Sequence, residues 1–277
     1  MRWKQFLTPV KLMTADQARE HINERPAGGL TLLDVRQPEE YEMNHIAGAK
    51  LIPLPDLSER LGEIDPKKTT IVYCAIGARS RVGAQMLSDK GFEDIYSLDG
   101  GIKAWNGEIA LLSEEKGLDL FTGNESPEET LVAAYSLEEG LRDFYSTMGE
   151  KVENEEAKRL FRQLSEIEIK HQERILEEYG RISGRSLTKQ EFEEKLVAGV
   201  IEGGMTTEEY SNLFLPDWES VHDIIDIAMS IEAQALDLYM RASDKVNDAR
   251  SKEQLSRIAD EERVHLTMLG EMISKTS

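Results

Sequence analysis

The spacing pattern that most constrains the fold is a carboxylate–histidine triplet that occurs twice in the second half of this 277-residue chain. In each copy two glutamates lie 30 residues apart, and a histidine follows the second glutamate by three positions. The two triplets are Glu138, Glu168 and His171, and Glu232, Glu262 and His265. Four helices that each contribute a glutamate, two of them adding a histidine one turn later, form the donor set of a two-metal carboxylate site. The pattern therefore predicts an all-α four-helix bundle with one long crossover and a metal centre.

Four long amphipathic helices are expected to carry these residues, over about 127–152, 155–179, 218–246 and 251–273. Each member of the two triplets falls on the apolar stripe of its helix. Four carboxylates in a helix core are very costly unless they are paired, so we expect two divalent cations to neutralise them. Imidazole nitrogen combined with carboxylate oxygen suits iron or manganese. Residues 180–216 would form the crossover, with a helical stretch over 189–201.

A single Glu-x-x-His motif is weak evidence in a chain this rich in glutamate. Four of the five histidines have a glutamate three positions before them, and for any one pair an ordinary helix face is the simpler interpretation. Six residues on four apolar stripes with matched spacing favour the metal site. His222 also lies on the stripe of the third helix, but it is ten residues from Glu232, about 15 Å along a helix. We expect it to lie outside the site.

Residues 127–273 resemble the rubrerythrin branch of the ferritin-like di-iron family. The resemblance implies that the six residues of the triplets bind two non-haem iron ions, with manganese as the alternative metal. It also implies reduction of peroxide or oxygen with electrons from an external donor. Tyr145 and Tyr239 would donate hydrogen bonds to ligand carboxylates, with ordinary packing in the bundle core as the alternative for both.

Two features depart from the family pattern. Members with peroxidase activity usually carry a further glutamate three residues after the third-helix ligand, where this chain has Ala235. Many members also carry a rubredoxin-type iron held by four cysteines, whereas Cys74 is the only cysteine here. A module that binds iron or forms a homodimer without turning over peroxide is therefore an alternative to a peroxidase.

The first part of the chain has a different hydrophobic pattern, in which short apolar runs alternate with helical segments. Strands are expected at 30–35, 69–73 and 95–98, and helices at 15–24 and 81–90. Strands that alternate with helices predict an α/β domain with a mainly parallel sheet and helices on both faces. We expect this domain over residues 1–112, a polar linker over 113–126 and the bundle over 127–277.

Cys74 lies at the carboxyl end of the second predicted strand, where parallel sheets place their functional sites. The backbone N–H groups of the loop that follows would favour a thiolate and bind an anion. Arg79 adds a fixed positive charge, and Ser80 is expected to cap the next helix. The alternative is a buried structural cysteine, which is the usual state of a free cysteine.

Residues 14–105 closely resemble a single-domain rhodanese. The resemblance rests on Asp34-Val-Arg36, on the stretch 40–49, on the Cys74 loop and on the segment from Gly91-Phe92 through Gly100-Gly101 to Trp105. It implies a sulfurtransferase in which Cys74 becomes a persulfide, with thiosulfate or a persulfide as donor and a thiol as acceptor. Arg79 and the loop residues would bind the substrate anion; these loop residues are Ala75, Ile76, Gly77, Ala78 and Ser80. Asp34 and Arg36 would brace the loop from the neighbouring strand.

Two alternatives bear on this loop. A cysteine phosphatase has five residues between its cysteine and arginine, whereas this chain has four. The resemblance to rhodanese implies that the shorter loop fits a sulfur atom better than a phosphate. A sulfur carrier that delivers to a protein partner is the non-enzymatic alternative to a sulfurtransferase that turns over freely.

Composition limits the partners of the protein. A net charge of −20 argues against nucleic acid, because a phosphate backbone is bound through lysine and arginine. No apolar run is long enough to cross a bilayer, so no membrane partner is expected. One cysteine excludes an internal disulfide and suits a reducing compartment. The prediction is a cytoplasmic, homodimeric protein that acts on small sulfur compounds.

Overall fold

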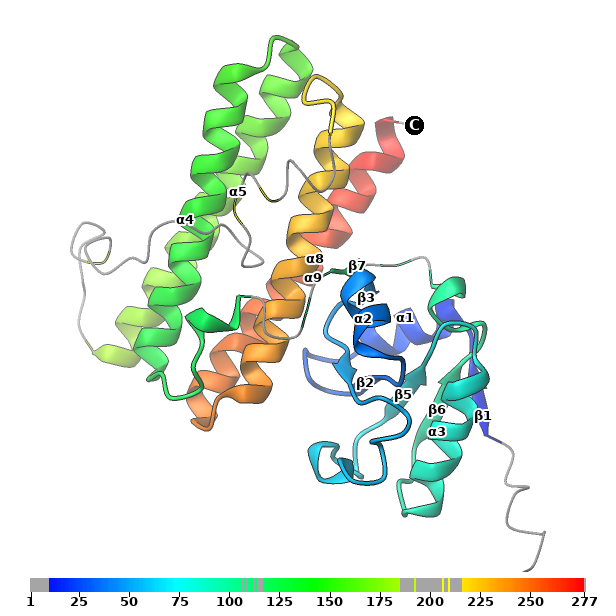
Figure 1. Ribbon diagram of the computed structural model, residues 1–277. Coiled ribbons are helices and arrows are strands. Elements are labelled where there is room, and N and C mark those ends of the chain that lie inside the picture. Colours follow the sequence, from blue (N-terminus) through cyan, green and yellow to red (C-terminus); the bar gives the residue numbers. More distant parts are fainter. Residues whose placement is uncertain are drawn as a thin grey trace, which may run out of the picture. The chain divides into compact units, whose positions relative to one another are not determined.

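The structure, a computed structural model, describes residues 10–105, 107, 109–111, 113, 117–184, 192, 206, 209 and 216–276. The chain divides into two compact units, which we call the first unit (Met1–Glu114) and the second unit (Glu115–Ser277). Figure 1 shows short strands and helices in the first unit and long helices in the second. The division falls within the segment that the sequence predicts to be a linker.

A five-stranded sheet forms the centre of the first unit, with the strand order β1-β6-β5-β2-β4. Its strands are β1 (Lys11–Met13), β2 (Thr31–Asp34), β4 (Lys50–Leu51), β5 (Thr70–Tyr73) and β6 (Ile95–Leu98). All neighbouring strands of this sheet pair in parallel. Two further strands, β3 (His45–Ile46) and β7 (Ile109–Ala110), form a separate antiparallel pair. The predicted α/β unit with a parallel sheet is confirmed.

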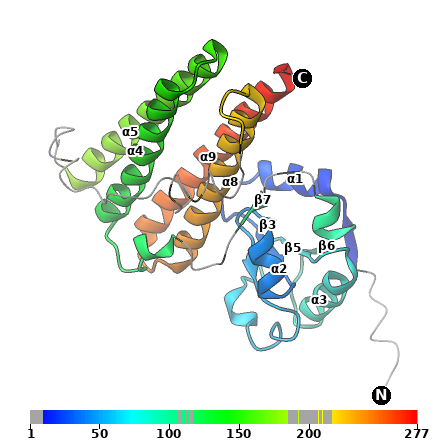
Figure 2. The same ribbon diagram turned by 45° about the horizontal axis from the view of Figure 1, so that its top comes forward.

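Helices cover both faces of the parallel sheet (Figure 2). Residues of α1 (Ala15–Asn23) share one core cluster with Leu32, and residues of α3 (Ala78–Asp89) share the other with Leu33. Leu32 and Leu33 enter different clusters because successive residues of a strand point to opposite faces. Burial of both faces explains why these strands are continuous apolar runs in the sequence.

The short elements of the first unit differ most from the sequence prediction. α3 begins at Ala78, before the predicted start at residue 81, because Gly77 adopts φ 98° and occupies the N-cap position. The prediction that Ser80 caps this helix is wrong. Ser80 lies in the first turn, where its hydroxyl oxygen is 3.2 Å from the carbonyl oxygen of Gly77. The segments not predicted are β1, β3, β4, β7, α2 (Pro38–Met43), η2 (Leu61–Glu63) and η3 (Gly101–Ala104), which are too short for a periodic signal.

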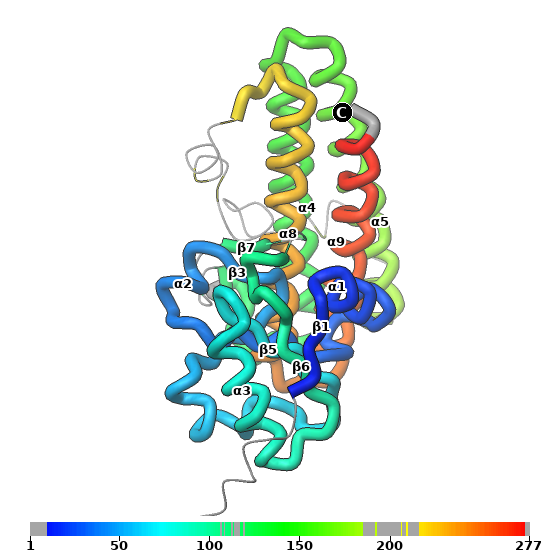
Figure 3. Tube along the Cα trace, turned by 90° about the vertical axis from the view of Figure 1, so that its right-hand side faces the viewer, coloured from blue at the N-terminus to red at the C-terminus, as the bar shows by residue number. Residues whose placement is uncertain are grey.

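In the described part of the second unit there are four long helices: α4 (Pro127–Lys151), α5 (Glu155–Ser183), α8 (Val221–Lys245) and α9 (Ala249–Thr276). α4 packs along α5 and α8 packs along α9, so the unit consists of two helical hairpins (Figure 3). The predicted bundle of four helices is confirmed. None of the described helices has both the length and the apolar content needed to cross a bilayer.

The two hairpins are also joined outside their helices. Glu219, which precedes α8, accepts hydrogen bonds from the backbone N–H groups of Glu153 and Asn154 in the α4–α5 turn, at 2.7–3.0 Å. The predicted helical stretch over 189–201 lies outside the described residues except for Phe192. The Phe192 ring packs against Tyr135 of α4 with 4.9 Å between the ring centroids, so the crossover contributes to the bundle core.

The close approach of η3 to the cysteine loop depends on a glycine. Gly101 has φ 61°, and a Cβ atom there would lie 2.2 Å from the carbonyl oxygen of Cys74. We therefore expect Gly101→Ala to lower the free energy of unfolding of the first unit by about 1–3 kcal/mol, as measured by calorimetry. The control is Gly62→Ala in η2, where the added methyl group meets no heavy atom within 4 Å. Equal effects of the two substitutions would show that the close approach has no energetic importance.

Candidate functional site

The thiol of Cys74 lies in a cradle of backbone N–H groups between β5 and α3. Its side chain is 1% exposed, and the N–H group of Gly77 donates to the sulfur at 3.2 Å. Burial by itself raises the pKa of the Cys74 thiol. Hydrogen bonds from the backbone of Ser80, Ile76 and Gly77 and from the Ser80 hydroxyl outweigh it, and the pKa lies below its usual value. The loop therefore favours the thiolate, which is the nucleophilic form of cysteine.

A pair of buried hydroxyl groups extends from the sulfur. The Cys74 sulfur and the Ser80 oxygen are 3.7 Å apart, and the Ser80 and Ser97 oxygens are 2.8 Å apart. Both serines are fully buried. Sequence analysis identified Ser80 but missed Ser97, because a serine in the middle of β6 carries no local signal and meets the loop only through sheet packing.

Arg79 forms a two-pronged ion pair with Glu40 of α2. Its Nη1 and Nη2 atoms donate to Glu40 Oε2 and Oε1 at 2.6 and 2.7 Å. The Arg79 guanidinium lowers the pKa of the Glu40 carboxyl to about 2. Glu40 belongs to the stretch on which the rhodanese resemblance rests, but sequence analysis gave it no role. Nothing local to either residue indicates a partner 39 positions away.

Asp34 and Arg36 form a buried brace beside the loop. Arg36 donates to both carboxylate oxygens of Asp34 at 2.6–3.0 Å, and its Nη2 atom donates to the backbone oxygen of Asn44 at 2.6 Å. The Tyr73 hydroxyl accepts a hydrogen bond from the Ile46 N–H group at 3.1 Å. These bonds hold the ends of β2 and β5 against the segment that follows α2, the helix that carries Glu40.

The six residues of the sequence triplets gather into two buried clusters in the second unit. One consists of Glu138, Glu168 and His171, and the other of Glu232, Glu262 and His265. Within each cluster one potential ligand atom per residue lies within 4.8 Å of the other two. All six side chains are buried, with exposed fractions of 0–5%. The doubled spacing in the sequence therefore corresponds to two matching clusters in space.

The two clusters are neighbours. The rings of His171 and His265 stack with their centroids 3.8 Å apart and their planes at 8°. His171 Nδ1 lies 3.3 Å from a carboxylate oxygen of Glu138, and His265 Nδ1 lies 3.3 Å from one of Glu232. Burial raises the pKa of both carboxyls, but the histidines outweigh burial, and the pKa of Glu138 and that of Glu232 lie below the usual value. A set of four carboxylates and two imidazoles fits two ions of iron or manganese.

The predicted contacts of Tyr145 and Tyr239 with ligand carboxylates stay a prediction. Both side chains are fully buried. Tyr145 packs against Phe161 and Tyr239 against Phe121, each with 6.3 Å between ring centroids. Ala235, which stands where a further carboxylate would extend the site, is also fully buried.

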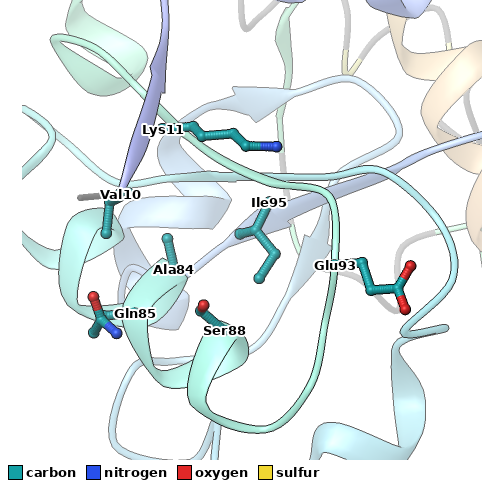
Figure 4. Close-up of a pocket in the computed structure, with 7 residues that line it drawn as sticks. All are labelled: Val10, Lys11, Ala84, Gln85, Ser88, Glu93 and Ile95. Carbon is teal, nitrogen blue, oxygen red and sulfur yellow. The ribbon is translucent and has the colours of Figure 1, made fainter. Parts of the chain in front are cut away.

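A cavity of about 150 Å³ lies in the first unit, apart from the cysteine loop (Figure 4). Its lining comes from the start of β1, from α3 and from the region of β6. The lining residues are Val10, Lys11, Ala84, Gln85, Ser88, Glu93 and Ile95. None of them belongs to the predicted sites.

A cysteine loop at the carboxyl end of the middle strand of a parallel sheet, followed by a helical unit with two buried Glu–Glu–His clusters, defines a two-domain protein that combines an α/β cysteine-loop domain with a helical bundle suited to metal binding. A Rhodanese-like domain model matches residues 14–108, and a Rubrerythrin model matches residues 129–273. The second match covers more than half of the chain, so the chain belongs to the rubrerythrin family, with a rhodanese-like domain on its N-terminal side. Both resemblances noted in the sequence are confirmed.

Curated relatives match the rhodanese-like domain. The chain is 46% identical over 78 residues to the uncharacterized protein YqhL of Bacillus subtilis (28% of this chain, 62% of that protein). It is 35% identical over 80 residues to the thiosulfate sulfurtransferase GlpE of Shewanella oneidensis (29% of this chain, 79% of that protein). The chain thus spans less than two thirds of YqhL and more than two thirds of GlpE. A solved rhodanese-like domain protein from Staphylococcus aureus is 30% identical, with 38% of this chain and 100% of that one covered and a TM-score of 0.35.

The Ser80 hydroxyl should help to hold Cys74 as a thiolate. Because Ser80→Ala removes a hydrogen bond that lowers the pKa of Cys74, we expect the pH midpoint for alkylation of the single cysteine to move upward. At neutral pH the alkylation rate should fall severalfold, since one such hydrogen bond contributes about 1 kcal/mol. The control is Ser88→Ala, on the exposed face of the same helix. A midpoint that does not move in Ser80→Ala would show that the backbone N–H groups act alone.

Proposed function

We propose that the rhodanese-like domain is a sulfurtransferase that carries sulfane sulfur on Cys74. The observation that supports this most strongly is the N–H cradle around a thiol whose pKa is lowered despite burial. The Cys74 thiolate attacks the outer sulfur of a donor, a new S–S bond forms, and the donor's S–S bond breaks. Thiosulfate leaves as sulfite and a persulfide leaves as a thiolate. The Cys74 persulfide then passes its outer sulfur to an acceptor thiol.

The loop residues have distinct parts in this proposal. The backbone N–H groups of Ile76, Gly77 and Ser80 stabilise the sulfur anion on Cys74. Arg79 adds positive charge beside the thiolate, since the charge of Cys74 in turn raises the pKa of Arg79. The similarity to GlpE, which is named as a thiosulfate sulfurtransferase, supports the same reaction class.

Removal of the sulfur atom tests the proposal directly. We expect Cys74→Ala to abolish sulfur transfer from thiosulfate or cysteine persulfide to cyanide, measured as thiocyanate, because the persulfide has no other cysteine on which to form. An unchanged unfolding temperature would show that the variant is folded. Transfer at the wild-type rate by a folded Cys74→Ala protein would rule out the proposed route.

We propose further that the rubrerythrin domain holds two non-haem iron ions, with manganese as the alternative metal. The observation that supports this is the burial of four carboxylates beside two stacked histidines. When bound, the metals supply redox chemistry toward peroxide or oxygen, with electrons from an external donor. The six buried side chains would hold the ions and keep bulk water away from them. Ala235 offers no further carboxylate, which favours metal binding without rapid peroxide turnover as the second candidate function.

Substitution of one proposed ligand should distinguish a bundle that binds metal ions from one that folds without them. We expect Glu168→Gln to reduce the bound metal from about two ions per chain to one or fewer, measured by elemental mass spectrometry. Peroxide consumption by the iron-loaded protein with an added reductant should fall in parallel. The control is Glu166→Gln, an exposed residue on the same helix. Equal metal content in both variants would contradict the assignment of Glu168 as a ligand.

A further inference from the structure

The ion pair between Arg79 and Glu40 changes the charge of the cysteine site. Arg79 supplies the positive side chain of the loop, and both of its terminal nitrogens are engaged by one carboxylate at 2.6 and 2.7 Å. Two-pronged contacts of this kind are the strong form of the arginine–carboxylate pair. The carboxylate offsets part of the positive field of the guanidinium, so an incoming dianion is attracted less strongly than by an unpaired arginine.

The Glu40 carboxylate has a second partner besides Arg79, so this ion pair differs from a mobile surface contact. Its Oε2 atom also accepts a hydrogen bond from the backbone N–H group of Gln37 at 3.2 Å, as part of the capping box at the start of α2. The side chains of Arg79 and Glu40 are 35% and 29% exposed. The start of α2 fixes the position of the Glu40 carboxylate, and the fixed carboxylate in turn restrains the Arg79 guanidinium.

The rest of the loop carries no charge that could replace Arg79. Residues 75–78 are Ala-Ile-Gly-Ala, and the Ile76 side chain is 63% exposed. Met43, which follows Glu40 by three positions and so shares its face of α2, is 68% exposed. The two elements that meet in the ion pair thus also present apolar side chains to solvent. A donor with a carbon skeleton and little net charge suits these elements better than a small dianion.

We propose that Glu40 makes the Cys74 site selective for organic persulfides of low net charge over the thiosulfate dianion. This inference rests on the proposed sulfur transfer and names the donor class for it. Glu40 acts as a positioning residue through Arg79. The Cys74 thiolate attacks the outer sulfur of R–S–SH, the donor leaves as RS⁻, and the proton stays with the transferred sulfur. The site then accommodates a leaving thiolate and no sulfonate group.

The test compares two donors in a single turnover of the full-length protein. Intact-protein mass spectrometry follows the gain of one sulfur atom on Cys74 from thiosulfate and from cysteine persulfide, whose ammonium and carboxylate charges cancel. Glu40→Gln keeps the capping geometry at the start of α2 but leaves the charge of Arg79 uncompensated. We expect the ratio of the thiosulfate rate to the persulfide rate to rise about tenfold, as Coulomb attraction of a dianion by a partly exposed cation implies.

One control variant separates the local ion pair from a change in net charge. Glu39→Gln makes the same change in net charge at the neighbouring exposed position and should keep the wild-type ratio. A merely structural role of Glu40 would lower both rates together, and an unchanged ratio in Glu40→Gln would overturn the inference. Failure of the wild-type protein to gain sulfur from either donor would instead overturn the sulfurtransferase function itself.

Discussion

Four carboxylates and two imidazoles are buried together in the second unit, where an isolated charge would cost several kcal/mol. The clusters lie within the helices, at 0–5% exposure, so the helices must continue on both sides of them to supply apolar packing. The stacked His171 and His265 rings bring the two hairpins together at this level. Each hairpin supplies half of the donors, so neither hairpin alone completes the pair of clusters.

The first unit also buries an anionic group, but it stabilises that anion with different partners. Cys74 is as deeply buried as the carboxylates, and backbone N–H groups of the loop take the place of imidazoles and cations. Parallel pairing puts the carboxyl ends of β2 and β5 side by side, which places the Asp34–Arg36 brace next to the loop. Gly77 and Gly101 permit the tight approach of α3 and η3 that closes the cradle. In both units a buried anion is tolerated because its partners are fixed by the fold.

The parts of the fold that the sequence predicted are those with a long repeat or a clear apolar run. Four helices of at least 25 residues repeat their apolar stripe often enough to be recognised, and the strands β2, β5 and β6 form continuous apolar runs. The start of α3 was misplaced because Gly77 in a left-handed conformation ends the loop earlier than a serine cap would. Strands of two or three residues such as β1 and β4 were not predicted, because they exist only through pairing with neighbours.

The sequence by itself determined the candidate residues for the proposed chemistry: the two triplets through their spacing, and Cys74 through its place after a strand. Those signals are local motifs or regular spacings, which can be read directly from the amino-acid sequence. Only the tertiary structure decided what surrounds these residues. Three contacts join segments far apart in the chain: the stacking of His171 on His265, the contact of Ser97 with Ser80 and the ion pair of Arg79 with Glu40. Such pairings depend on how helices and strands pack, and no spacing within one segment encodes them.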